Sequence, residues 1–305
     1  MNTAMQMVDL GHGVPSMSRL IYGVWRLADD SDTSDKAIIA KIEACLEQGL
    51  TTFDHADIYG DYSCEALFGR AIKDRQDIKD AMQTITKCDI MLESAKYPDH
   101  RVKYYDTSPA HIQRSVEASL SRIGIDVIDL LLIHRPDPFM DHHATGAALD
   151  GLIDAGKVRG IGVSNFMPWD VDLLQSAMKY PLLTNQIEIS LLAREPFLNG
   201  QIAQWQRMGQ PLQAWSSLAG GQLFDLSNAA TARLTPRMKE IAAQNSVGID
   251  AVALAWLLAH PANIMPVVGT NTIERIKTIS DAFKPEIDRQ TWHELWSLAT
   301  GHEVP

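Results

Sequence analysis

The sequence predicts an α/β fold, a (β/α)8 TIM barrel that occupies residues 1–305 as a single domain. Short apolar segments of strand character alternate eight times with segments of helix character, which indicates a parallel sheet that closes after eight repeats. The length agrees, because such a barrel takes about 250 residues and leaves the rest for long loops and a tail. No linker rich in proline, glycine or serine divides the chain.

Each predicted strand is a short apolar run that is followed by a predicted helix. In chain order the strands are 20–24, 51–53, 82–86, 128–133, 158–163, 183–187, 212–215 and 264–268. The helices that follow them are 34–48, 64–73, 108–123, 143–155, 168–179, 196–207, 235–245 and 272–283.

Local signals mark the ends of several helices. Ser108 precedes Pro109, a residue well suited to the first helical position, and Gly124 follows the last residue of the same helix. Gly49 and Gly156 have the same stopping position after the first and fourth helices. The segment 89–106 has no such pattern, so we expect a long irregular connection that either shapes a substrate pocket or is disordered.

Four ionisable side chains follow three consecutive predicted strands. Asp54 and Tyr59 come after the second strand, Lys87 after the third and His134 after the fourth. Because the carboxyl ends of barrel strands meet at one face, we expect these side chains to converge there. Taken singly, Asp54 also fits a turn cap, Tyr59 a half-buried tyrosine and His134 a core histidine. Lys87 favours the functional interpretation, because lysine is almost never fully buried without a partner.

This set of side chains suits proton donation coupled to hydride transfer. A phenol has an ordinary pKa of about 10, which is high for an acid at neutral pH, and a nearby ammonium lowers it. We therefore expect Lys87 to lower the pKa of Tyr59, and Asp54 to hold the Lys87 charge in an ion pair. A carbonyl oxygen held between Tyr59 and His134 would lie where negative charge develops during reduction.

With these residues the chain resembles the aldo-keto reductase family, whose tetrad falls in order on Asp54, Tyr59, Lys87 and His134. The neighbouring residues, Phe-Asp-x-Ala-x-x-Tyr and Leu-Ile-His, match as well. The segments 156–166 (GKVRGIGVSNF) and 267–275 (VVGTNTIER) resemble the second and third signatures of the family. The resemblance extends over nearly the whole chain and implies an NADPH-dependent oxidoreductase that reduces aldehydes or ketones to alcohols, with Tyr59 as the proton donor.

The chain lacks the dinucleotide fingerprint of Rossmann folds, since the glycine pairs at 11–13 and 160–162 are only near misses. The family binds an extended nicotinamide cofactor across the barrel mouth without that fingerprint. The resemblance implies that the nicotinamide carboxamide contacts Ser164, Asn165 and Gln186. It further implies ring stacking on Trp215, a pyrophosphate loop at Ser216, Ser217 and Leu218, and residues near the nicotinamide at Gly23 and Trp25.

The third signature favours NADP over NAD. Gly269, Thr270 and Asn271 precede a predicted helix that starts near residue 272, and backbone amides at a helix start attract phosphate. Arg275 lies one turn further and can clamp a 2′-phosphate through its planar fork.

Composition argues against several other classes of protein. The net charge of −11 opposes binding to nucleic acid or anionic membranes, which requires a basic surface. No apolar run approaches the ~20 residues of a membrane span, and residues 1–10 lack the parts of a secretory signal, so we expect a cytoplasmic protein. The odd, widely spaced Cys45, Cys64 and Cys88 fit reduced thiols. We expect the binding partner to be a small-molecule carbonyl substrate. The sequence does not reveal the oligomeric state and is compatible with a monomer.

Two alternative functions remain open at this point. A nicotinamide-binding sensor or regulatory protein of the same fold would bind cofactor with little turnover. A metal-dependent barrel hydrolase or isomerase would need ligands, but His55, Asp57, His142 and His143 lack the spacing of known zinc sites. We therefore expect no metal.

Overall fold

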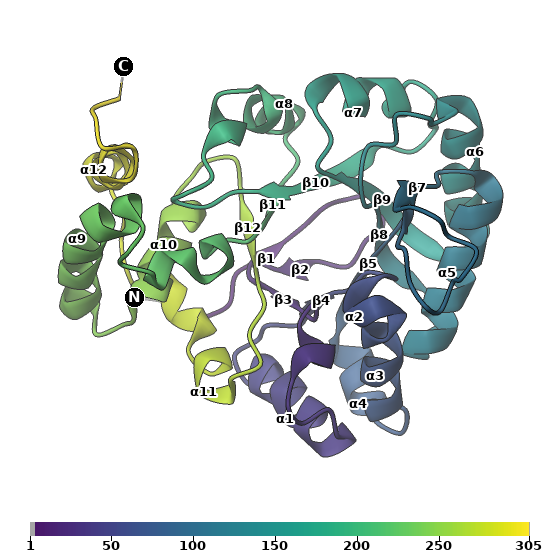
Figure 1. Cartoon of the computed structure of the whole chain (residues 1–305), viewed down its shortest axis with the longest axis horizontal. Coiled ribbons are helices and arrows are strands. Elements are labelled where there is room, and N and C mark those ends of the chain that lie inside the picture. Colours follow the sequence, from purple (N-terminus) through teal and green to yellow (C-terminus); the bar gives the residue numbers. More distant parts are fainter. Residues whose placement is uncertain (1–3, 305) are drawn as a thin grey trace.

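The computed structural model describes residues 4–304, and its centre is a closed barrel of eight parallel strands (Figure 1). Around the barrel the strands follow the order of the chain: β3 (Ile21–Gly23), β4 (Thr52–Asp54), β5 (Gln83–Cys88), β8 (Ile128–Ile133), β9 (Val158–Ser164), β10 (Leu182–Glu188), β11 (Leu212–Trp215) and β12 (Met265–Val268). The predicted TIM barrel is thus confirmed, and each predicted strand lies within two residues of an observed one.

Helices cover the outside of the barrel, and each of those named here except the last lies between two successive strands. They are α1 (Asp35–Leu46), α3 (Cys64–Ala71), α5 (Pro109–Ile123), α6 (His142–Asp154), α7 (Pro168–Gln175), α8 (Gln201–Met208), α10 (Ile249–Leu258) and the single turn α11 (Ile273–Ile276). The predicted caps of α5 are confirmed, because the Ser108 hydroxyl accepts from the backbone N–H of His111 and Gly124 has the left-handed φ of 75°.

A short hairpin closes the barrel at the amino ends of its strands. Its strands β1 (Met7–Val8) and β2 (Met17–Ser18) pair antiparallel. Leu10, Val14 and Met17 from this hairpin are buried against inward-facing strand residues that include Leu130 and Leu183. The interior is therefore a packed core at this end, and a ligand can enter only from the opposite, carboxyl end.

Two further helices lie beside the barrel on one flank. They are α9 (Ala229–Asn245) and α12 (Arg289–Thr300), which contact each other (Figure 1). Trp292 of α12 stacks on Trp256 of α10 with ring centroids 4.7 Å apart, and the indole N–H of each ring donates to the backbone carbonyl of the other residue. This exchange attaches the C-terminal helix to the barrel.

The structure corrects several predicted helix bounds. The helix predicted at 235–245 begins at Ala229, because Asn228 caps it and Pro236 lies inside it. The segment 196–207 contains a separate 3-10 turn, η2 (Glu195–Phe197), since Gly200 has a positive φ before α8. The helix at 272–283 divides into α11 and the 3-10 helix η4 (Ile279–Phe283), because the Thr278 hydroxyl donates to the Arg275 carbonyl at the break.

Other elements were not predicted at all. They are α2 (Tyr59–Tyr62), α4 (Gln76–Ala81), α10, α12, and the 3-10 helices η1 (Leu27–Asp29) and η3 (Ala219–Phe224). The connection 89–106 is less irregular than expected, because β6 (Ile90–Met91) and β7 (Tyr104–Tyr105) pair within it. No single helix within residues 4–304 is long and apolar enough to cross a membrane, and one bent pair, α9 with α10, passes that test jointly.

Candidate active site

Lys87 is the centre of the predicted tetrad. Its Nζ donates to Asp54 Oδ1 at 2.6 Å, to the His55 carbonyl at 2.8 Å and to the Tyr59 hydroxyl at 3.0 Å. The lysine is completely buried at the end of β5, and its three ammonium donors thus have three oxygen partners. Asp54 reaches the same point from the end of β4. The predicted convergence of Asp54, Tyr59 and Lys87 is therefore present in the structure.

A tight bend after β4 directs the Tyr59 ring toward Lys87. Tyr59 starts the short helix α2, in which Gly60 has φ 58°. A Cβ at Gly60 would lie 2.5 Å from Ala28 Cβ and 2.7 Å from Cys64 Sγ, so both the left-handed backbone and the close packing require glycine here. The ammonium of Lys87 also lies 4.9 Å from the Tyr59 ring centroid.

Burial raises the pKa of Tyr59, and this effect exceeds the lowering by the Lys87 charge and its hydrogen bond. Burial also disfavours the Lys87 ammonium, but the attraction of Asp54 and Tyr59 is larger in sum and raises the pKa of Lys87. The expected lowering by Lys87 is thus real but smaller than the effect of burial. At neutral pH the lysine stays charged, and the phenol keeps its proton and can donate it.

His134 completes the tetrad at the end of β8. Its ring faces that of Tyr59 edge-on, with centroids 6.0 Å apart. Burial, followed by the nearby charges of Lys87, Arg135 and Lys103, lowers the pKa of His134 well below its usual range. The imidazole is therefore neutral at physiological pH and has one N–H to donate. Its buried Nδ1 has no hydrogen-bond partner within residues 4–304.

Gln186 links the tetrad to the opposite side of the barrel. Its side-chain amide donates to Asp54 Oδ1 at 2.9 Å and to Gln213 Oε1 at 2.8 Å. Gln186 was predicted to contact a nicotinamide carboxamide, and these two bonds leave only its carbonyl oxygen for that contact. Gln213 was not singled out in the sequence, because a lone buried glutamine in an apolar strand carries no recognisable signal.

The predicted carboxamide and ring-stacking residues lie together at the ends of β9 and β11. The Ser164 hydroxyl donates to the Gln186 carbonyl at 2.7 Å, and Asn165 adopts a left-handed φ of 62° directly after it. Asn165 Nδ2 donates to the His134 carbonyl at 3.2 Å, while Asn165 Oδ1 accepts from Trp215 Nε1 at 2.9 Å. The half-buried Trp215 ring is thereby fixed beside the tetrad, which suits the stacking proposed for it.

The predicted pyrophosphate loop leaves the end of β11 as a tight curl. Ser216 and Ala219 have positive φ, as do Gly220 and Gly221 of η3. The hydroxyl of the buried Ser217 donates to the Val267 carbonyl at 2.9 Å, so it ties the loop to β12. The other two residues predicted for this loop, Ser216 and Leu218, are partly exposed.

The predicted phosphate residues follow β12 on the same face. The backbone carbonyl of Thr270 accepts from the Tyr22 hydroxyl at 2.8 Å, and Asn271 Nδ2 donates to the Arg26 carbonyl. Gly269 and Thr270 therefore begin a loop that these two hydrogen bonds attach to β3 and to the segment just beyond it. Arg275 lies on the single turn α11, is exposed, and makes no ion pair or hydrogen bond through its side chain within residues 4–304.

Two glycines keep the barrel rim open between β3 and β12. A Cβ at Gly23 would lie 3.1 Å from Val267 Cγ1, and a Cβ at Gly269 would lie 3.3 Å from the Gly23 carbonyl. Trp25, just beyond, has 54% of its surface exposed and contacts the Arg26 guanidinium through its ring. The half-buried Trp215 ring offers a flat apolar surface, and the Asn165 and Gln186 amides offer hydrogen-bond partners. Together with the glycines of the rim, these residues fit a nicotinamide ring and its carboxamide.

A group of buried acids lies behind the tetrad, which sequence reasoning did not anticipate. Asp57 and Asp89 are buried, and burial raises the pKa of Asp57 to about 7 and that of Asp89 well above its usual range. Asp89 Oδ2 accepts from the backbone N–H of Arg135 at 3.1 Å and so helps to fix the segment after His134. Within residues 4–304 no group of three or more His, Cys, Asp or Glu side chains is arranged to hold a metal ion.

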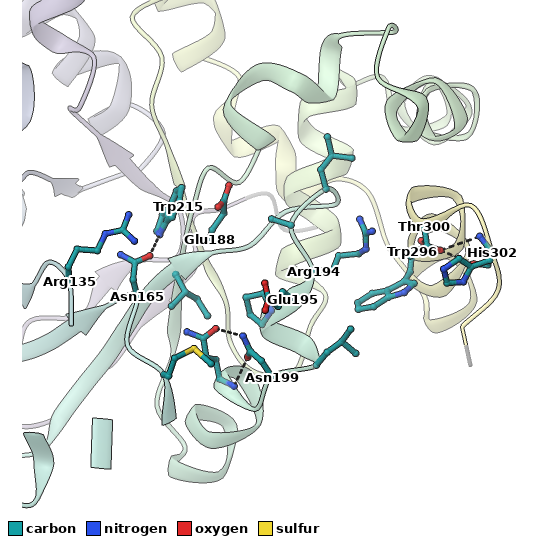
Figure 2. Close-up of a pocket in the computed structure, with 17 residues that line it drawn as sticks. Arg135, Asn165, Glu188, Arg194, Glu195, Asn199, Trp215, Trp296, Thr300 and His302 are labelled. Atoms are coloured by element: carbon teal, nitrogen blue, oxygen red, sulfur yellow. Dashed lines mark hydrogen bonds between the residues drawn. The ribbon is translucent and has the colours of Figure 1, made fainter. Parts of the chain in front are cut away.

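Arg135 and Glu188 also lie at this face, and the sequence analysis assigned them no role. Figure 2 shows both beside Trp215 and Asn165, at one end of a cavity of about 830 Å³. Glu188 is two residues beyond Gln186 in the same strand, and residues at this spacing point to the same side of a sheet. This two-residue repeat, counted from Gln186, is the sequence pattern from which the position of Glu188 at the site could have been predicted.

Comparisons with known proteins agree with this geometry. The model of the Aldo/keto reductase family matches residues 19–299. A 6-dehydroglucose reductase of Agrobacterium fabrum is 52% identical over 94% of this chain and 96% of that protein. The uncharacterized oxidoreductase YcsN of Bacillus subtilis is 40% identical over 99% of this chain and 100% of that protein. The crystal structure of the thermostable aldo-keto reductase Tm1743 with the inhibitor epalrestat has a TM-score of 0.80 and 26% identity, over 96% and 100% of the two chains. The chain therefore belongs to the aldo-keto reductase family of oxidoreductases.

Proposed function

We propose that this reductase uses NADPH to reduce the aldehyde of a hydroxylated, sugar-like substrate, with 6-dehydroglucose as the first candidate. Membership of the family makes the chain an oxidoreductase that acts on carbonyl compounds. The 52% identical relative is named for the reduction of 6-dehydroglucose, which supports a substrate of this class. The observation that carries the reaction type is the buried Lys87, which holds the hydroxyl of Tyr59 and the carboxylate of Asp54 at once.

In the proposed reaction Tyr59 is the proton donor. Reduction of a carbonyl leaves negative charge on its oxygen, and the phenolic proton neutralises that charge as it develops. The Lys87 ammonium, 3.0 Å from the phenol oxygen, then stabilises the phenolate that remains. Asp54 keeps the ammonium charged and in place, and its own carboxylate is held by Gln186. A bound NADPH would supply the hydride.

His134 serves as the second donor to the carbonyl oxygen. Because its pKa is lowered well below the usual range, the ring donates as a neutral imidazole and does not compete with Tyr59 as an acid. Two fixed donors that point at one oxygen in a site of low dielectric stabilise the charge of the transition state without reorganising. The hydrogen bond from Asn165 to the His134 carbonyl supports the position of this segment.

The cofactor is held, in this proposal, by Ser164, Asn165, Gln186 and Trp215 at the nicotinamide. The loop of Ser216, Ser217 and Leu218 would hold the pyrophosphate, and the segment of Gly269, Thr270 and Asn271 would hold the 2′-phosphate end of NADPH. Arg275 makes NADPH the preferred form, because its exposed guanidinium has no ion-pair partner within residues 4–304 and is free to bind a 2′-phosphate.

The replacement Tyr59→Phe tests the acid directly. It removes the hydroxyl and keeps the ring, so we expect turnover of 6-dehydroglucose to fall by about 10²- to 10⁴-fold, the usual contribution of a positioned acid. NADPH binding, followed by quenching of tryptophan fluorescence, should change by less than about twofold. Tyr180→Phe serves as a control, because Tyr180 is a half-buried tyrosine whose hydroxyl donates to Asp154 and not to the site. Full turnover in the Tyr59 variant would refute this assignment. Tight NADPH binding by wild type without turnover of any carbonyl would favour a regulatory protein.

The replacement Arg275→Met tests the cofactor preference. We expect the Kd for NADPH to rise by roughly 10-fold or more and the Kd for NADH to change little, because only NADPH carries the 2′-phosphate. Lys277→Met is the matched control, since Lys277 is an exposed cation two residues further along the chain. Equal weakening of both cofactors, or equal effects of the two variants, would remove the proposed contact.

A further inference from the structure

A cavity of about 830 Å³ extends from the barrel mouth to α12, and the proposed reaction uses only one end of it. Figure 2 shows Arg135, Asn165, Glu188 and Trp215 at the inner end, with Arg194, Trp296 and His302 at the outer end. The volume lies within the range typical of small-molecule sites, ~300–1,000 Å³. Such a space is far larger than a reacting carbonyl needs, so it can accept the remainder of a substrate.

The inner end of the cavity is continuous with the catalytic face. Arg135 directly follows His134, whose carbonyl accepts from Asn165 Nδ2 at 3.2 Å. Asn165 in turn accepts from the Trp215 indole N–H, and Trp215 is the register partner of Glu188 on the neighbouring strand. A substrate whose carbonyl lies at His134 would therefore meet Arg135 and Glu188 with its next atoms.

Arg135 and Glu188 carry opposite charges that are not joined in a salt bridge. Neither side chain makes a hydrogen bond or an ion pair within the part of the chain that the structure describes, although both line the same end of the cavity. The Arg135 guanidinium lies 5.8 Å from the Trp215 ring centroid. It offers five N–H donors in a rigid fork, whereas the Glu188 carboxylate only accepts. The Arg135 charge lowers the pKa of Glu188 against the larger opposite effect of burial, so the two groups attract each other without a direct contact. Their hydrogen-bond donors and acceptors are left for a ligand that enters the cavity.

Few ligand groups satisfy both sets. An anionic group would gain from Arg135 but be repelled by Glu188, so the pair does not suit a carboxylate or phosphate. An alkyl or aryl group would take both charges out of water without giving them partners, which is costly. A hydroxyl donates to a carboxylate and accepts from a guanidinium, and neighbouring hydroxyls of a sugar do both at once.

We propose that Arg135 and Glu188 form a hydroxyl-binding subsite that selects uncharged, polyhydroxylated aldehydes over aldehydes of the same size without hydroxyls. This inference rests on the proposed function and specifies its substrate class. The Arg135 guanidinium lies over the Trp215 ring, and Asn165 connects that ring to the backbone of His134. The two charged residues are specificity determinants, and the reaction itself stays with the tetrad.

The test compares two ring-bearing aldehydes, 6-dehydroglucose and cyclohexanecarbaldehyde, with NADPH as the reductant. We expect wild type to prefer the hydroxylated aldehyde in kcat/KM. Arg135→Met and Glu188→Gln should each lower that preference by roughly 10- to 100-fold, because each leaves a substrate hydroxyl without its charged partner. Glu195→Gln is the matched control, an exposed carboxylate that lines the same cavity further along, and it should keep the wild-type preference.

Other outcomes separate the inference from the function on which it rests. If wild type reduces both aldehydes and the preference stays within twofold of wild type in both variants, the subsite is wrong and the reductase stands. A loss in kcat/KM of equal size for both aldehydes, or a parallel rise in the Kd for NADPH, would also overturn the subsite by making these residues catalytic or cofactor-binding. If wild type reduces neither aldehyde, the proposed function fails and the subsite fails with it.

Discussion

Burial determines the charge states of single residues in this molecule as much as neighbouring charges do. Tyr59 has a cation 3.0 Å away, and still burial sets the direction in which its pKa moves. Sequence reasoning could name the ammonium that lowers the pKa, because Lys87 is visible in the chain. It could not weigh that ammonium against desolvation, since desolvation depends on how many distant segments pack over the phenol.

Asp57 offers a test of this effect on stability. Burial raises its pKa from 3.8 to about 7, and its Oδ2 accepts from the Ser115 hydroxyl at 2.7 Å. Between about pH 4 and pH 7 the unfolded chain releases this proton while the folded chain keeps it, so the free energy of unfolding falls as pH rises. Asp57→Asn cannot titrate and keeps an acceptor for Ser115. Between pH 4.5 and pH 8 we therefore expect the free energy of unfolding of wild type to fall by on the order of 2–4 kcal/mol more than that of the variant.

Urea unfolding of both proteins at pH 4.5 and pH 8 measures this difference. Asp74→Asn is the control, because Asp74 is an exposed carboxylate with no hydrogen bond within residues 4–304, and its pH dependence should match that of wild type. If Asp57→Asn and wild type lost stability in parallel between the two pH values, folding would not raise the pKa of Asp57, and the prediction would be wrong.

At the scale of elements, close packing between helices depends on missing side chains. Gly69 of α3 faces the end of α5, and a Cβ there would lie 2.0 Å from the Arg122 carbonyl oxygen and 2.7 Å from that of Ile123. Both obstacles are backbone atoms, which cannot move aside alone. Gly151 of α6 is also helical, but apart from its chain neighbours and its own helix backbone no atom of residues 4–304 lies within 4 Å of its Cβ position.

Alanine at these two glycines should therefore have opposite effects. Gly69→Ala should lower the free energy of unfolding by about 2–3 kcal/mol, the upper range for overpacking. Gly151→Ala should raise it by about 0.5–1 kcal/mol, because alanine has the higher helix propensity. Urea unfolding of the two variants and of wild type measures both changes. A stable Gly69→Ala protein would mean that α3 and α5 can separate without cost.

The elements that the sequence predicted well are those with a local signal. The eight strands are apolar runs, and Ser108, Pro109 and Gly124 mark α5 at both ends. The start of α9 was predicted at residue 235, but Asn228 caps the helix and Pro236 lies inside it. Helix α10 was missed because it is apolar almost all round, with seven of its ten residues buried, and so has no amphipathic period.

The candidate site shows the same division. The tetrad could be predicted because each member follows a strand and matches a family motif. Arg135 and Glu188 lie on β8 and β10 or just beyond them, and their common cavity exists only once those strands have closed into a barrel. Their lack of a hydrogen bond or salt bridge within residues 4–304 is likewise a property of the fold, since no local sequence pattern distinguishes a charge in a salt bridge from one outside it.

At the scale of the whole molecule, the residues proposed for the reaction and the residues that close the core lie at opposite ends of the barrel. The proposed catalytic and cofactor residues lie at or beyond the carboxyl ends of the strands, and the amino ends are closed by the β1–β2 hairpin. Leu10 of this hairpin is 1% exposed and packs into the barrel core, whereas Met7, three residues earlier, is 49% exposed. A change in the hairpin core is thus remote from Lys87 and His134, and should act on folding alone.

Leu10→Ala should accordingly lower the free energy of unfolding by about 2–4 kcal/mol, since it removes buried methyl groups and leaves a cavity in a core that relaxes only in part. Its kcat at 25 °C, counted per folded molecule, should stay within twofold of wild type, because the tetrad is fixed by hydrogen bonds at the other end of the strands. Met7→Ala is the control and should change neither quantity. Urea unfolding gives the first quantity and steady-state turnover the second. A loss of kcat that follows the loss of stability would show that the two ends of the barrel are mechanically coupled, so that the geometry around Lys87 depends on how tightly the hairpin closes the far end.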